Sequence, residues 1–229
     1  MENQKGRSHQ VRNRKTYFVL LLSFLSIYGC FIKSESEQYK QLKRAYEADP
    51  KNPEVLQSLI LSELLEQNNT KKAVELYETN ADVLSNWIMA RVYYATALCR
   101  MAGESDNPSK QLKYVRQGMH EFELLREKWP DDGRIYIWQA ITYSNFPEML
   151  GAAQMVTETI ELVNKNIMSN KWSFVTAELR QLVFAYINLA KEYKNVSYLH
   201  AAEEQAANTG LMDDEEIKKA IAMAKKGIK

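Results

Sequence analysis

From Glu35 to the end of the chain, apolar residues recur at intervals of three and four, the spacing of one face of an α-helix. The segment 49–80 is the clearest example. One face of its first half carries four apolar residues and one acid: Leu56, Leu59, Ile60, Leu64 and Glu63. Glycine (8) and proline (5) are scarce among 229 residues, which argues against folds that need many glycine-rich turns. The chain is therefore expected to be all-α.

Breaks in this periodicity divide segment 49–80 into two helices. Pro53 is suited to the first turn of a helix, where its missing N–H costs nothing. The polar run 67–70 predicts a turn, and Thr70 is the expected N-cap of the second helix. The facing stripe of that second helix consists of Ala73, Leu76 and Tyr77. Each helix of the pair is too short to bury its own apolar stripe, so it needs a neighbour.

Further pairs of this kind follow along the chain, and together they resemble tetratricopeptide repeats. That family places small residues where its two helices approach closely, with aromatic residues beside them and proline after the second helix. The positions that carry the resemblance are Ala73 and Tyr77; Trp87, Ala90 and Tyr94; Gly118, Phe122 and Pro130; Tyr136, Ala140, Tyr143 and Ala152; and Leu179, Leu182 and Tyr186. Residues 38–53 are similar to a preceding second helix, and residues 102–109 predict an additional loop.

The resemblance implies a right-handed superhelix of stacked antiparallel helix pairs, with about four degenerate repeats over residues 38–208. A last helix is expected at 213–227, with acids at its start and lysines at its end, as the helix dipole favours. We expect this helix to cap the open end of the array. A stack of this kind curves around a concave groove, so the resemblance also implies a protein partner bound there as a peptide or a helix.

The N-terminal residues determine the expected compartment. A basic segment, residues 1–15, precedes an uncharged apolar run at 16–32. The end of this run, Ile27-Tyr28-Gly29-Cys30, resembles the lipobox of bacterial lipoprotein precursors, although Tyr28 is bulkier than the usual small residue. The resemblance implies cleavage after Gly29 and acylation of Cys30, with palmitate among the expected acyl chains. Two or three acyl chains would anchor the protein stably in a membrane.

This interpretation divides the chain into a signal peptide (1–29), a tether (30–37) and a TPR-like helical repeat domain (38–229). The alternative is an uncleaved signal-anchor helix at 16–32, close to the shortest length that spans a bilayer. Both place the body in the cell envelope, on the periplasmic side of the membrane. Phe31 stands where the enterobacterial sorting rule has aspartate for retention in the inner membrane, so the outer membrane is favoured.

Charge and motif content exclude several classes of function. Formal net charge is +1, but residues 1–15 hold five of the 30 basic residues and one of the 29 acids, so the body is mildly acidic. No basic field for nucleic acid is visible. The sequence contains no phosphate-binding loop, HExxH motif or nucleophile elbow. We therefore expect no catalytic residues, no cofactor and no metal. His120 and His200 lie in different predicted helices, and Cys99 is expected to be a packed core thiol.

Aromatic residues gather in the middle of the chain, and most are expected to pack between helices. Tyr93 and Tyr94 are adjacent, and Tyr136 and Trp138 are two apart, so one of each pair should leave the core. Exposed aromatic residues are frequent anchors of binding sites. We therefore predict that Tyr94, Tyr136 and Trp138 lie near the concave groove.

A second, local resemblance concerns the turn at residues 143–151. The pattern Tyr-Ser-x-x-Pro-x-x-Leu-Gly is similar to a turn in the periplasmic T component of TRAP-type transporter systems, with Pro147 expected at the start of the following helix. That likeness implies an alternative function: a transporter accessory that binds a small hydrophobic or organic-acid ligand in a cavity. The alternative is a purely structural role, in which Pro147 and Gly151 only allow tight packing between two helices.

Overall fold

The structure, a computed structural model, describes residues 36–228, and over that range it is all-helical, as expected. The described helices belong to one compact unit, Glu37–Lys229. The first six are α1 (Glu37–Ala48), α2 (Pro53–Leu65), α3 (Thr70–Thr79), α4 (Ala81–Leu84), α5 (Ile88–Glu104) and α6 (Pro108–Lys128). The others are α7 (Gly133–Tyr143), the 3₁₀ helix η3 (Glu148–Leu150), α8 (Ala152–Met168), α9 (Thr176–Glu192), α10 (Val196–Asn208) and α11 (Glu215–Gly227).

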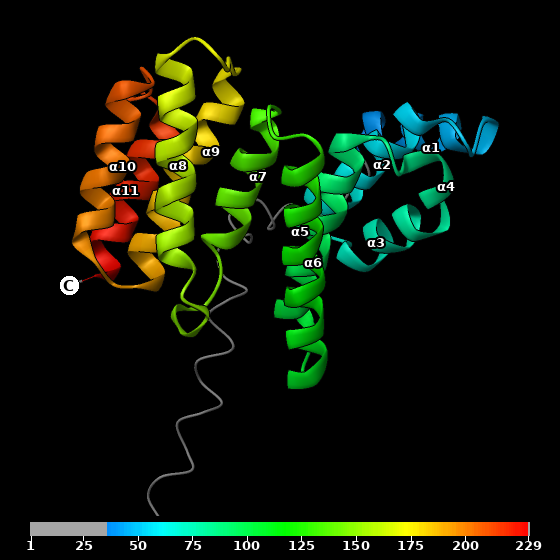
Figure 1. Ribbon diagram of the computed structural model, residues 1–229, viewed down its shortest axis with the longest axis horizontal. Helices are drawn as coiled ribbons and strands as arrows, with labels where there is room; N and C mark the ends of the chain where they lie inside the picture. The colour runs from blue at the N-terminus through cyan, green and yellow to red at the C-terminus, as the bar shows by residue number, and fades with distance from the viewer. Residues whose placement is uncertain (1–35, 229) are drawn as a thin grey trace, which may run out of the picture. The chain divides into compact units, whose positions relative to one another are not determined.

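Consecutive helices pack as pairs, and each pair packs against the next (Figure 1). The pairs are α2 with α3, α5 with α6, α7 with α8, and α9 with α10. The first helix of each pair also contacts the first helix of the following pair, and α9 contacts α11 in the same way. The main contacts of the unit are thus between neighbours in the chain order, as the short amphipathic segments require.

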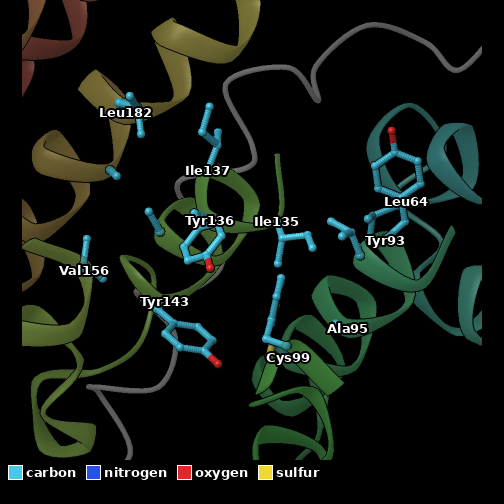
Figure 2. Close-up of a cluster of buried hydrophobic side chains, with 14 of the residues drawn as sticks. Leu64, Tyr93, Ala95, Cys99, Ile135, Tyr136, Ile137, Tyr143, Val156 and Leu182 are labelled. Carbon is cyan, nitrogen blue, oxygen red and sulfur yellow. The ribbon is translucent and has the colours of Figure 1, made fainter. Parts of the chain in front are cut away.

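The first helices of the pairs form the interior of this arrangement. Ten of the 17 residues of α5 are buried, and eight of the 11 residues of α7. In α6, by contrast, only four of 21 residues are buried. Figure 2 shows the interior around α7. Its residues Ile135, Tyr136 and Ile137 lie between Tyr93, Ala95 and Cys99 of α5 on one side and Val156 of α8 and Leu182 of α9 on the other.

The helix pair predicted at 49–80 is confirmed, with one error at a cap. All five residues predicted for the inner face of the first helix are buried, Glu63 included. Pro53 occupies the first position of α2 as expected. Thr70, however, is not the N-cap of α3: the Asn69 side chain accepts the N–H of Lys72. Thr70 is instead buried and donates its hydroxyl to the carboxylate of Glu104, across to α5.

The loop predicted at 102–109 is shorter than expected. Helix α5 continues to Glu104 and α6 begins at Pro108, so only residues 105–107 connect them. The Asn107 side chain accepts the N–H groups of Ser109 and Lys110 and thereby caps α6. This tight connection folds the two longest neighbouring helices back against each other.

The turn at 143–151 also differs from its expected form. Pro147 is not at the start of α8, because the 3₁₀ helix intervenes and α8 begins at Ala152. Gly151 adopts the left-handed conformation, with φ 62°, and a Cβ there would meet nothing within 4 Å. Gly151 therefore serves the reversal of the chain, because the left-handed backbone conformation favours glycine. It is not needed for close packing between helices.

The predicted last helix begins two residues later than expected, with Asp214 as its N-cap. Its acids lie in the first turn and its lysines in the last, as expected from the helix dipole. The guanidinium of Arg180, on α9, pairs with the carboxylates of Asp214 and Glu216. This pairing and the burial of Ile217 and Ile221 fix α11 against the last helix pair.

Candidate functional site

The three aromatic residues predicted for the groove pack against three different rings. Tyr94 of α5 is partly buried and stacks on Tyr77 of α3, with ring centroids 4.2 Å apart. Its hydroxyl donates to the carboxylate of Glu78 at 3.1 Å. Burial, with the nearby Glu78 carboxylate, raises the pKa of the Tyr94 hydroxyl. Tyr94 therefore belongs to the contact between α3 and α5.

Trp138 and Tyr136 point in different directions from α7. Trp138 is partly exposed and packs edge-on against Tyr93, with centroids 5.0 Å apart. Tyr136 is buried, and its ring lies 5.0 Å from that of Trp172. The Tyr136 hydroxyl donates to the carbonyl of Pro130 at 3.0 Å. Tyr136 thus contacts the connection between α6 and α7 from the interior of the unit.

An open depression of about 610 Å³ lies at this connection, and we call it the loop depression. Two connections form it, α6 to α7 and α8 to α9, together with the first turns of α7 and α9. Its lining comprises Lys128, Trp129, Pro130, Asp131, Asp132, Gly133, Arg134, Lys171, Trp172, Ser173, Phe174 and Glu178. Segments about forty residues apart in the sequence therefore build one surface.

Close packing at Gly133 sets the aromatic part of the depression. A Cβ at this position would lie 2.5 Å from Phe174 Cζ and 2.8 Å from Trp172 Cδ2. Only a residue without a side chain lets both rings approach the first turn of α7. Trp172 is buried, and its indole N–H has no hydrogen-bond acceptor among the described residues. A buried donor of this kind costs about 1–3 kcal/mol.

Ion pairs line the rim of the loop depression. Lys171 and Asp131 bridge the two connections at 2.7 Å, and both side chains are largely exposed. Arg134 pairs with Asp132 at 2.6 Å at the start of α7. Burial of Asp132 opposes its ionisation, but the hydrogen bonds and charge of Arg134 lower the pKa of the carboxyl below its usual value. Exposed pairs contribute little stability, so they can exchange partners at small cost.

Neither Trp172 nor Phe174 is predicted from the sequence as a site residue. The available signal was the run Lys171-Trp172-Ser173-Phe174, which follows a helix and contains two aromatic residues in a polar connection. Aromatic residues in a connecting segment indicate either packing or a binding surface. Here they do both, because Trp172 packs on Tyr136 and lines the depression.

Cys99 is a buried core thiol, as expected. Burial raises its pKa to about 12, so the nucleophilic thiolate is scarce at neutral pH. The two histidines of the described region are exposed, and each lies 3.6 Å from a glutamate three residues ahead in its own helix. Within residues 36–228, no cluster of three potential ligands for a metal is found.

We expect Cys99 to resist alkylation by iodoacetamide at pH 8 while the protein is folded, and to react once it is unfolded. An unfolded thiol loses its proton near pH 8.5, whereas the folded one keeps it to about pH 12. The folded state therefore binds more protons between these values, and stability should fall as pH rises through this window. Peptide mass mapping of the alkylated cysteine would check the first point. Alkylation at the same rate in folded and unfolded protein would contradict it.

None of the described helices is both long and apolar enough to cross a bilayer. Cys30, the residue expected to be lipidated, lies outside the described residues. Comparison with known proteins adds no relative, since no family model, curated protein or solved structure matches the chain.

Proposed function

We propose that this chain is a lipid-anchored, TPR-like scaffold of the cell envelope that binds another protein and catalyses no reaction. The observation that carries the proposal is the serial packing of helix pairs, each in contact with its neighbours in the chain order. Arrays of this kind present extended surfaces to partner chains. The small residue at the contact between α5 and α6, Gly118, supports the family assignment, as does Ala73 in the contact between α2 and α3.

The loop depression is the part of this surface that we assign to the partner. It is open to solvent and lined by both charged and aromatic side chains, which suits a peptide segment of another protein. The alternative, a small hydrophobic or organic-acid ligand, would instead need an enclosed and largely apolar cavity. The buried Trp172 N–H, which has no acceptor among the described residues, gives further support. An interior selected for stability alone would not leave a buried donor without an acceptor.

Anchoring through Cys30 places the body in the periplasm, with the outer membrane favoured. The lipobox-like sequence supports this part of the proposal. The intact mass of the chain purified from membranes would test it: loss of residues 1–29 and a gain of acyl chains is the expected result. Retention of residues 1–29 without added lipid would support the signal-anchor alternative.

A photo-cross-linking residue at Ser173 tests the assigned surface. Ser173 is exposed and lines the depression, while Lys219 on α11 is also exposed and does not line it. With the full chain in its own membranes, we expect Ser173 to cross-link to one discrete protein and Lys219 to give no such product. Equal products from both positions, or none from Ser173, would contradict the assignment.

The substitution Gly133→Ala is expected to reduce the Ser173 cross-link several-fold while the protein stays helical. The new methyl group must displace Phe174 and Trp172, which costs about 1–3 kcal/mol and changes the shape of the depression. Gly227→Ala is the matched control, because a Cβ at Gly227 meets nothing within 4 Å. Circular dichroism and cross-link yield, measured together, separate a change of surface from a loss of fold.

A further inference from the structure

The connected ends of α5 and α6 form a projecting tip, which we define as residues 105–117. Helix α6 has 21 residues, and its first buried residue is Val115. Its first seven residues therefore have no buried member, in contrast to its C-terminal half. Figure 1 shows this end of the α5–α6 pair extending beyond the adjacent helices α3 and α7. Since α6 rises about 1.5 Å per residue, its first residue, Pro108, lies roughly 30 Å from Lys128 at the edge of the loop depression, and Arg116 lies roughly 18 Å from it.

The tip is basic: it contains three cations and one acid, Asp106. Lys110, Lys113 and Arg116 are all exposed, and none has an ion-pair partner among the described residues. No acidic residue occurs in the sequence between Asp106 and Glu121. The body as a whole carries a small net negative charge, so this concentration of positive charge is local.

The charge at the start of α6 does not serve the stability of the helix. The first turn of a helix carries partial positive charge, so the basic residue there, Lys110, is unfavourable by about a few tenths of a kcal/mol. Helix α11 follows the favourable order, with acids first and lysines last. Helix α6 has no acid in its first turn, and three of its five cations lie in its first half, although Arg126 and Lys128 occupy the last turn in the favourable order. An unfavourable charge at an exposed position indicates selection for a property other than stability. Complementary charge on a partner explains it directly.

An apolar residue accompanies these cations. Leu112 is 45% exposed and lies between Lys110 and Lys113 in the sequence. Positive charge around an exposed leucine fits a partner surface that offers carboxylates beside an apolar side chain.

We propose that the tip is a second docking surface, distinct from the loop depression, and that its occupant is an acidic segment of a partner protein. Charge complementarity selects an acidic occupant. A protein segment is favoured over a membrane because Leu112, exposed beside the cations, suits an occupant that presents an apolar side chain together with carboxylates.

The test uses the full chain in nanodiscs of zwitterionic lipid. The probe is a short fluorescein-labelled peptide in which glutamate alternates with leucine, compared with its counterpart that carries glutamine in place of glutamate. We expect fluorescence anisotropy to show binding of the acidic peptide that weakens as salt is raised. The combined variant K110Q, K113Q and R116Q should bind it roughly tenfold more weakly. L112S alone should weaken it to a smaller extent and with unchanged salt dependence.

A control variant removes the same charge elsewhere on the unit: K71Q, K72Q and K219Q, all at exposed positions. We expect it to bind the acidic peptide like the unchanged chain. Equal weakening in both variants would overturn the proposal, because only net charge would then matter. It is also overturned if neither peptide binds, if the tip variant loses only binding to anionic vesicles, or if it loses only self-association. The Ser173 cross-link should persist in the tip variant, so failure at the tip is distinguishable from failure of the loop depression.

Discussion

Replacement of Gly118 by valine should lower the free energy of unfolding by roughly 3 kcal/mol. Gly118 lies on α6 where that helix contacts α5 closely. A Cβ there would overlap the Sγ of Cys99 and lie 2.8 Å from the carbonyl oxygen of Ala95. The second of these is backbone, so the two helices must separate to admit the side chain. Urea unfolding followed by tryptophan fluorescence measures the change.

Two comparisons separate this clash from the helix propensity of valine. Gly227→Val places the same residue where nothing lies within 4 Å of the new Cβ, and should cost under about 1 kcal/mol. In a Cys99→Ala background the effect of Gly118→Val should shrink but not vanish, because the Ala95 carbonyl remains. Similar losses at Gly118 and Gly227 would show that the two helices do not depend on this close approach.

The second large effect is expected from Tyr143→Ala, at about 3–5 kcal/mol. Tyr143 is only 2% exposed. Its ring packs edge-on against Phe122 of α6, at 5.6 Å, and stacks on Phe146 at 5.0 Å. Removal of the ring leaves a cavity where α6, α7 and the following turn meet. Chemical denaturation at constant pH provides the measurement.

The matched variants for this site are Tyr143→Phe and Met149→Ala. Tyr143→Phe keeps the ring and removes only the hydroxyl, which lies near the Gln139 side chain, so a cost of about 1 kcal/mol or less is expected. Met149 is 84% exposed, and its truncation should change stability by less than about 0.5 kcal/mol. If Tyr143→Phe were as destabilising as Tyr143→Ala, the hydroxyl would be the main contribution and the packing argument would be wrong.

Most of the helical architecture could be predicted from the sequence, because local spacing determines it. The inner face of α2 and the small residue at Gly118 follow from helical periodicity and from the need for close approach. The cap of α3 was misplaced by one residue because Asn69 and Thr70 are both good capping residues, and only tertiary contact decided between them. Thr70 is directed to Glu104 of α5, a partner that local sequence does not reveal.

The candidate site was harder to predict, for a physical reason. Helix α7 is surrounded by α5, α8 and α9, so nearly all of its faces are apolar and its pattern identifies no outer face. Tyr136 and Trp138 therefore could not be ranked by exposure. The loop depression depends on contact between Asp131 and Lys171, which lie forty residues apart and meet only in the folded chain. The periodicity of one segment carries no information about a contact between two segments that are distant in the sequence.

The neighbour-to-neighbour packing of the helix pairs has a consequence for the dynamics of the protein. Helices α1 and α11 have neighbours on one side, whereas α5 and α7 have them on both. Local opening can therefore begin at either terminus and proceed inward one pair at a time, before the whole unit unfolds. The ends would exchange amide hydrogens first, and the middle pairs, which carry both proposed docking surfaces, would keep their order longest.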